Sequence, residues 1–165
     1  MAHHEVVTVI LVEGESDRAA LEVVVARLGA ELPRILAVGG SLGVGRAVAE
    51  LPGERLLGLV DAAERSHFEA YLAEVFVCDP DLESELIQAL GVAGVEAVLE
   101  SEHELESFRL LQRQPGLRES TPEHQLLRFI GGRSGNKLRF ARLLARAVPL
   151  EKVPAPLAAL ISAVR

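Results

Sequence analysis

The fold is decided at residues 7–28, which read VTVILVEGESDRAALEVVVARL. The apolar run over residues 6–12 predicts a buried strand, and apolar positions at helical spacing predict a helix over residues 17–28. Between them, Gly14 supplies the turn and Ser16 supplies a hydroxyl that can cap the helix. The stretch therefore predicts a strand that passes through a tight turn into a helix.

Glu13 is the residue in this stretch that the turn does not require. It stands at the end of the predicted buried strand, where removing a carboxylate from water costs free energy. Acids near a helix start can complement the helix dipole, which explains Asp17 better than Glu13. We therefore expect Glu13 to have a chemical role, as a metal ligand or a proton carrier.

Strand and helix signals alternate beyond this unit. Apolar runs without strict alternation, separated by amphipathic helices, indicate a mostly parallel sheet flanked by helices, that is, an α/β fold. The further predicted strands are 34–38, 56–60 and 75–78, and the further helices are 42–50, 67–72 and 82–90. Residues 95–99 fit a strand or a helix. After residue 102 the pattern predicts only helices, over 102–112, 123–130, 137–148 and 157–164.

Charge divides the chain in a similar way. The net charge of −7 combines −15 over residues 1–108, with 6 basic and 21 acidic residues, and +8 over residues 109–165, with 11 basic and 3 acidic residues. We predict an α/β core over 1–108 and a basic helical extension, packed on that core, over 109–165. Acids can concentrate metal ions and basic helices can attract phosphates, although both sets could equally be solvated helix faces.

Composition limits the class of protein. The chain of 165 residues has 49% apolar residues, enough for a core, and no apolar run near the roughly 18 residues of a membrane span. The N-terminal residues lack the basic segment of a signal peptide, and the lone Cys78 suits a reducing compartment. We expect a cytoplasmic protein with no membrane partner. Its six scattered aromatic residues argue against a surface for stacking bases.

Acidic residues follow three of the predicted strands. Glu13 follows the first, Asp61 the third, and Asp79, Asp81 and Glu83 the fourth. The carboxyl ends of parallel strands meet at one edge of a sheet, where α/β proteins bind ligands. Carboxylates that converge there repel one another unless they share a cation or a proton. Oxygen ligands suit Mg²⁺ or Mn²⁺, so we predict a site for one of these ions.

The third acidic group has a structural alternative. Asp79 as N-cap, Pro80 at the first helical position and acids in the first turn would together be an ordinary helix start. Spacing alone favours that explanation, and only convergence with Glu13 and Asp61 favours a site.

The first motif also carries a family resemblance. The stretch LVEGESDRAALE places Glu13-Gly14-x-Ser16-Asp17 at the end of a strand. This motif resembles the first motif of TOPRIM domains, the fold shared by topoisomerases, bacterial primases and OLD-family nucleases, and it resembles the OLD type most.

Three further stretches extend the resemblance over residues 6–148. LVDAAE matches the Asp-x-Asp motif at Asp61, but Ala63 replaces the second Asp. CDPDLESEL is similar to the acidic turn that enters a helix in OLD-type domains, and SGNKLRFARLLA is similar to a later helix that opens with a Lys, here Lys137.

The resemblance implies metal-dependent cleavage of phosphodiester bonds in DNA or RNA, with Mg²⁺ or Mn²⁺ held by carboxylates. Carried over by position, the metal ligands are Glu13, Asp17 and Asp61, with a second site from Glu83 and Asp81. Lys137 would stabilise charge on the phosphate. Because Ala63 removes one carboxylate, the site could hold one metal, be rebuilt with Glu64 or Glu85, or be inactive.

Lys137 lies in a glycine-rich turn, GGRSGNKL, that is close to a P-loop. Asn136 and Leu138 stand where that motif requires Gly and Ser or Thr, so we exclude ATP binding there. The turn and the following helix, with Arg139 and Arg142, can still bind phosphate. A solvated helix face is the alternative.

Three functions remain open. The first is a Mg²⁺-dependent nuclease, the second a nucleotidyl transferase of the primase type, and the third a degenerate TOPRIM module that binds nucleic acid or a partner. Lys137 favours the first over the second, and Ala63 favours the third. OLD-type nucleases usually carry an ATPase domain ahead of the TOPRIM domain. This sequence shows no such domain and no intact P-loop, so we predict a stand-alone TOPRIM-like protein that acts alone or with an ATPase supplied in trans. The oligomeric state stays open.

Overall fold

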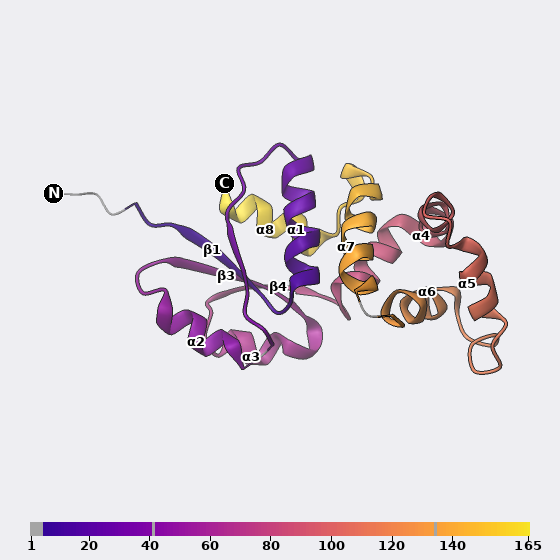
Figure 1. Cartoon of the computed structure of the whole chain (residues 1–165). Coiled ribbons are helices and arrows are strands. Elements are labelled where there is room, and N and C mark those ends of the chain that lie inside the picture. Colours follow the sequence, from indigo (N-terminus) through magenta and orange to yellow (C-terminus); the bar gives the residue numbers. More distant parts are fainter. Residues whose placement is uncertain (1–4, 41, 134) are drawn as a thin grey trace.

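The computed structural model describes residues 5–40, 42–133 and 135–165. It consists of a parallel sheet covered by helices on both faces, continued by a group of helices at one side (Figure 1). The predicted fold class, an α/β sheet followed by a helical C-terminal part, is confirmed. Within the described residues, no helix is both long enough and apolar enough to cross a membrane.

The sheet has four parallel strands in the order β2-β1-β3-β4. The strands are β1 (Thr8–Val12), β2 (Arg34–Ala37), β3 (Arg55–Asp61) and β4 (Glu74–Cys78), close to their predicted bounds. The two central strands, β1 and β3, are rich in Val, Ile and Leu, as expected for strands buried on both faces. Their parallel register places the ends of all four strands at one edge of the sheet.

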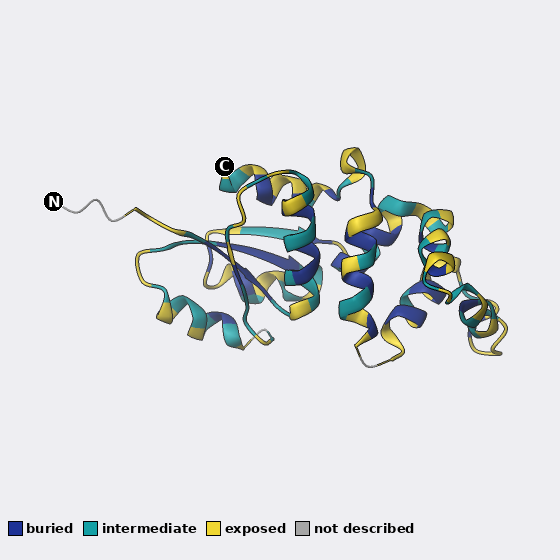
Figure 2. Cartoon of the chain, turned by 45° about the horizontal axis from the view of Figure 1, so that its top comes forward, coloured by how far each residue is buried: buried dark blue, intermediate teal, exposed yellow. Residues whose placement is uncertain are grey.

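The strand side chains alternate between two cores. Ile10 and Val12 face the core that includes α1 (Glu15–Arg27), α7 (Asn136–Ala147) and α8 (Ala155–Val164). Val9 and Leu11 face the smaller core beneath α2 (Gly43–Glu50) and α3 (Arg65–Glu69). Figure 2 shows these helices with buried faces toward the protein and exposed faces outward. Because β1 is packed on both faces, its position is fixed, and so is the start of the turn that follows it.

Helix α4 (Leu82–Ser101) consists of two helical segments, and the first ends at Gly91, as predicted for the helix over residues 82–90. Gly91 interrupts it with φ 74°, a conformation that glycine adopts without a side-chain clash. The chain then resumes a helix, so the ambiguous segment 95–99 is helical. Val95 and Leu99 are both fully buried in the larger core, and this packing makes the second half of α4 stable despite the break.

The remaining helices lie within a few residues of their predicted bounds. They are α5 (Leu105–Gln112) and α6 (Pro122–Gly131), which with the end of α4 form the side group of helices, and then α7 and α8, which return to the sheet (Figure 1). Thr121 caps α6 by accepting a hydrogen bond from the His124 N–H, as Thr-Pro at a helix start predicts. The boundary predicted between residues 108 and 109 falls inside α5, and the division into two domains stays a prediction.

Arg27 joins α7 to α1. Its guanidinium donates hydrogen bonds of 2.7 and 2.6 Å to the carbonyl oxygens of Ala145 and Val148, at the C-terminal end of α7. A positive charge at a helix C-terminus complements the helix dipole and satisfies carbonyls that lack partners within the helix. This contact helps fix α7, and thus the residues at its other end, against α1.

We predict that Arg27→Met lowers the free energy of unfolding by about 2 kcal/mol, the usual loss for hydrogen bonds from a charged donor. Arg46→Met is the control, because among the described residues the exposed Arg46 pairs only with Glu50 in its own helix, so its loss should change stability by less than about 0.5 kcal/mol. Urea unfolding followed by circular dichroism measures both variants. Equal losses would show that the Arg27 contact does not stabilise α7 on α1.

Candidate active site at the carboxyl edge of the sheet

Glu13 lies in the turn between β1 and α1, at the carboxyl edge of the sheet. Its carbonyl oxygen accepts hydrogen bonds from the N–H groups of Gly39 and Gly40, at 3.0 and 3.2 Å, so the turn after β1 is tied to the turn after β2. The Glu13 side chain is half-buried and close enough to raise the pKa of Asp17. The end of β1 and these two hydrogen bonds therefore fix the backbone of Glu13 at the carboxyl edge of the sheet.

Asp17 occupies the first turn of α1. Its carboxylate accepts a hydrogen bond of 3.1 Å from the Gly14 N–H, and Gly14 is the N-cap residue. The prediction that Ser16 caps the helix is wrong, because α1 begins at Glu15 and Ser16 lies inside it. Burial raises the pKa of Asp17 to about 6, with a further contribution from the negative charge of Glu83.

Asp61 is the last residue of β3. It accepts a hydrogen bond of 3.2 Å from the Leu82 N–H, which joins the end of β3 to the start of α4. Burial raises its pKa to about 7, and the negative charges of Asp17, Glu83 and Asp81 add to the effect. Acids that follow the ends of β1, β3 and β4 thus lie near enough to one another to raise the pKa values of Asp17 and Asp61.

Asp81 and Glu83 begin α4 and have different environments. Asp81 is the N-cap and accepts a hydrogen bond of 2.7 Å from the Ser84 N–H, so the prediction of Asp79 as the cap is wrong by two residues. Glu83 is buried, with 8% of its side chain exposed, and its Oε1 makes no hydrogen bond to any described residue. Asp81 therefore has a structural role, whereas the charge of the buried Glu83 depends on a positive partner nearby.

Lys137 brings a positive charge to the carboxylates from α7. Its Nζ lies 3.5 Å from Glu83 Oε1, and the charges of Glu83, and to a smaller extent Asp17, raise the pKa of Lys137. Gly135 caps α7 with φ 80°, a left-handed conformation, so the helix begins at the residue before the lysine. Ser134 in the same turn lies outside the described residues. Four elements, β1–α1, β3, α4 and α7, thus meet at one site.

The donor set fits a hard cation. Asp17, Asp61 and Glu83 offer only carboxylate oxygens. The buried Glu83 Oε1 has no hydrogen bond from a described residue, and a cation could take the place of that missing partner. Over residues 5–40, 42–133 and 135–165, however, no three His, Cys, Asp or Glu side chains are already arranged around a point where a metal could bind. Binding would require these side chains to rotate toward one another.

The two suggested substitutes for the missing carboxylate differ. Ala63 lies in a short 3₁₀ helix (Ala62–Glu64) directly after β3, and Glu64 ends that helix without an ion pair to a described residue. Glu85 belongs to the first turns of α4, two residues beyond Glu83. Burial and then the charge of Asp79 raise the pKa of Glu85, which places Glu85 on the Asp79 side of the helix start. Neither residue contacts Lys137 as Glu83 does.

The two predicted phosphate-binding arginines also differ. Arg139 forms ion pairs with Glu102 and Glu104, at 3.0 and 3.1 Å, and so joins α7 to the turn before α5. Arg142 is exposed, has no ion pair with a described residue, and lines a shallow groove beside Arg18 on α1. Glu15 and Glu22 also line this groove, and a role of Arg142 in binding phosphate stays a prediction.

The sequence patterns gave neither Asn136, which was noted only as a mismatch to the P-loop, nor Cys78 a role in the site. Asn136 is the first residue of α7, it is buried, and its Nδ2 makes no hydrogen bond to a described residue. Cys78 ends β4 beside the carboxylates, and burial, followed by the charge of Glu85, raises the pKa of its thiol. The sequence signals that could have indicated a role are the position of Asn136 directly before Lys137 and the position of Cys78 at the end of a predicted strand.

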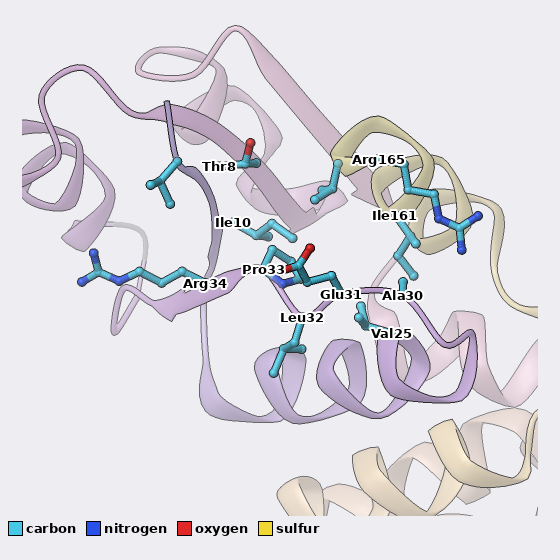
Figure 3. A pocket seen from close by; sticks show the side chains of 12 residues that line it. Thr8, Ile10, Val25, Ala30, Glu31, Leu32, Pro33, Arg34, Ile161 and Arg165 are labelled. Carbon is cyan, nitrogen blue, oxygen red and sulfur yellow. The ribbon is translucent and has the colours of Figure 1, made fainter. Parts of the chain in front are cut away.

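A cavity lies at the opposite edge of the sheet, at the start of the strands. It has a volume of about 470 Å³, and its lining includes Ile10, Val25 and Ile161 with Glu31 and Leu32 at the turn after α1 (Figure 3). The cavity is mainly apolar and contains none of the converging carboxylates. We therefore place the candidate active site at the carboxyl edge and not in this cavity.

Comparison with solved structures identifies the fold. The chain is similar to the C-terminal region of the OLD protein of Burkholderia pseudomallei, with a TM-score of 0.66 and 21% identity over 98% of both chains. It is also similar to that region of the OLD protein of Xanthomonas campestris pv. campestris, with a TM-score of 0.69, 22% identity, and coverage of 96% of this chain and 92% of that chain.

The chain has the fold of an OLD C-terminal region. A second structure from Xanthomonas campestris pv. campestris agrees, with a TM-score of 0.67, 24% identity, and coverage of 95% of this chain and 93% of that chain. The predicted resemblance to the OLD type is confirmed at the level of the fold. No family model matches the chain, and no curated protein matches it. That the domain stands alone stays a prediction.

We predict that, in the presence of a chelator, stability falls as pH rises from about 4 to 8. The pKa values of Asp17 and Asp61 rise from 3.8 to about 6 and 7 on folding, so the folded state holds their protons more tightly. Their contribution is fully present below about pH 4 and is lost as pH rises through 6 and 7. Thermal unfolding at a series of pH values measures this loss.

Asp61→Asn should make that pH dependence shallower and should raise stability at pH 8 by about 1 kcal/mol, because solvent screens part of the repulsion that it removes. Glu15→Gln is the control, since Glu15 is exposed and pairs with Arg18. Parallel curves for all three proteins would contradict the mutual repulsion of these carboxylates.

Proposed function

We propose that the chain is a metal-dependent nuclease that cleaves phosphodiester bonds in DNA or RNA. The observation that carries the proposal is the convergence of Asp17, Asp61 and buried Glu83, from three elements, on the single ammonium of Lys137. The fold of an OLD C-terminal region supports it, because the sequence motifs resemble TOPRIM domains of that type. Separately, each carboxylate could be structural, but their meeting at a ligand-binding edge favours chemistry.

The ion in this proposal is Mg²⁺ or Mn²⁺. Glu13, Asp17 and Asp61 would hold it, with Glu83 and Asp81 nearest to a second position. When bound, the ion would supply a water of lowered pKa and would neutralise charge on the phosphate oxygens. Because Asp81 already caps α4 and Ala63 offers no ligand, the chain's own residues support one metal position better than two.

The protein's residues have distinct roles around the scissile phosphate. Lys137, more than half exposed, can contact a non-bridging oxygen and stabilise the charge that develops there. Glu13 lies in the turn between β1 and α1, and its half-buried carboxylate can orient the attacking water. Asp61, whose pKa is about 7, can hold a proton near neutral pH. Arg142 can bind a neighbouring phosphate of the strand.

A second candidate is a catalytically inactive module that binds nucleic acid or a partner, and Ala63 is the observation that favours it. A nucleotidyl transferase of the primase type, an ATPase supplied in trans and a cytoplasmic location stay predictions. Incorporation of nucleotides on a template would support the transferase. Binding without turnover in either assay would support the inactive module.

We predict that the protein with Mg²⁺ or Mn²⁺ cleaves single- or double-stranded DNA or RNA, and that Glu13→Gln and Lys137→Ala each reduce the rate by about 100-fold or more. Glu50→Gln and Lys152→Ala are the matched controls, because Glu50 at the end of α2 and Lys152 in the short helix before α8 are exposed residues of the same types outside the site. Gel assays with end-labelled substrates measure cleavage. A folded wild-type protein that cleaves none of the four substrates with either ion would refute the nuclease.

Binding to nucleic acid should depend on Arg142 and not on Arg139. Arg142→Ala should weaken binding to a short duplex or single strand and reduce the slope of log affinity against log salt by about 1, as expected when one phosphate contact is lost. Arg139→Ala should instead lower the free energy of unfolding by up to about 1 kcal/mol, because it breaks two ion pairs.

Fluorescence anisotropy over a range of salt concentrations measures this binding, with Arg46→Ala as the control on α2, under the other face of the sheet. Unchanged binding by Arg142→Ala, or an affinity independent of salt, would contradict the phosphate contact.

A further inference from the structure

The Lys137 ammonium is the positive charge closest to the buried carboxylate. Its Nζ is 3.5 Å from Glu83 Oε1, and its charge also affects Asp17 and Asp61. These three carboxylates come from α4, α1 and β3, so one ammonium partly neutralises acids from three elements. In the described residues, Arg139 and Arg18 are engaged elsewhere, by Glu102 and Glu104 and by Glu15 and Glu22 respectively.

The two partners of this contact differ in their freedom to move. Glu83 is 8% exposed, and its Oε1 has no hydrogen bond from a described residue, whereas Lys137 is 59% exposed. A buried carboxylate requires a positive partner, and an ammonium on a flexible four-carbon chain can leave for solvent with little rearrangement. The 3.5 Å separation is longer than a good charged hydrogen bond, so the contact is loose enough to be exchanged.

We propose that Lys137 is a built-in counter-ion of the metal site, which a divalent cation displaces from Glu83 when it binds. The proposal rests on the metal site of the proposed function. It adds an order of events: the cation enters, the ammonium is released toward solvent, and the released ammonium becomes available to a phosphate of the substrate. No covalent step is involved.

Displacement would couple metal loading to substrate binding. With the ammonium held by Glu83, a phosphate has to compete with a carboxylate for it; with the cation in place, this competition is removed. Coupling between two binding events is reciprocal, so a phosphate that holds Lys137 should also raise the affinity for the cation. The metal-free protein would therefore bind substrate weakly at this position.

Removing Lys137 should increase metal affinity, because the cation no longer has a competitor. We expect Lys137→Met to bind Mn²⁺ about fivefold more tightly than wild type in calorimetry on the full chain, equivalent to about 1 kcal/mol. Lys152→Met is the matched control, since Lys152 is the only other lysine of the chain and lies on the exposed short helix before α8. It should bind as wild type does.

Calorimetry alone does not separate displacement from the loss of a distant positive charge, so the wild-type protein labelled with ¹³C-lysine provides the second measurement. Its two lysines give two Cε signals, and Lys137→Met identifies one of them. On addition of Mg²⁺, the Lys137 signal should move toward the shift of the solvated Lys152, which should stay unchanged. The shift itself is measured on the wild-type protein, and Lys152→Met gives the same assignment if Lys137→Met does not fold.

The outcomes are distinct. Tighter Mn²⁺ binding by Lys137→Met together with the Lys137 signal shift supports the counter-ion. Metal binding by wild type with a stationary Lys137 signal, or equal or weaker binding by Lys137→Met, overturns the counter-ion and leaves the metal site intact. The absence of metal binding by all three proteins overturns the counter-ion together with the metal site of the proposed function.

Discussion

Repulsion between carboxylates at one edge of the sheet is the constraint on which the site depends. Like charges held in a partly dry environment must share a proton, a metal ion or an ammonium, and here burial and mutual repulsion raise the pKa of Asp61 to about 7. Lys137 is the positive charge that the described chain brings to Glu83. The packing of α7 on α1, reinforced by Arg27 at the far end of α7, is therefore part of the electrostatics of the site.

The path of the chain serves this arrangement. Parallel pairing places the ends of β1 and β3 side by side, so the turns after them deliver Glu13 and Asp61 to the same edge. Helix α4 starts at that edge with Asp81 as its cap and then carries the chain away from the sheet. The side group of α5 and α6 reverses the direction, and α7 re-enters at the edge with its lysine (Figure 1). Acids from the first part of the chain and a base from the last part meet because of this return.

Much of this follows from local sequence signals, and the rest depends on packing. The apolar run before Glu13 predicts β1, and the position of Asp61 after an apolar run predicts its place at the edge. Capping was harder to predict, because Ser16 and Asp79 have side chains that suit an N-cap, yet Gly14 and Asp81 occupy the N-cap positions. The continuation of α4 past Gly91 depends on the burial of Val95 and Leu99, and the pairing of Arg139 with Glu102 and Glu104 depends on how α7 meets α5. Contacts between distant segments leave no periodic signal, so the sequence cannot separate Arg139 from Arg142.

The burial of the acids bears on whether the site is active. Ala63 removes one carboxylate from the second motif, which would suit a module that has lost catalysis. Yet Asp17 and Asp61 remain, with pKa values of about 6 and 7, and Glu83 remains buried with an unbonded oxygen. Each of these features costs stability in the absence of a cation, and neutral side chains of similar size would remove that cost. A bound cation would remove this cost and would be bound more tightly for that reason, which supports the proposed metal site over the inactive module.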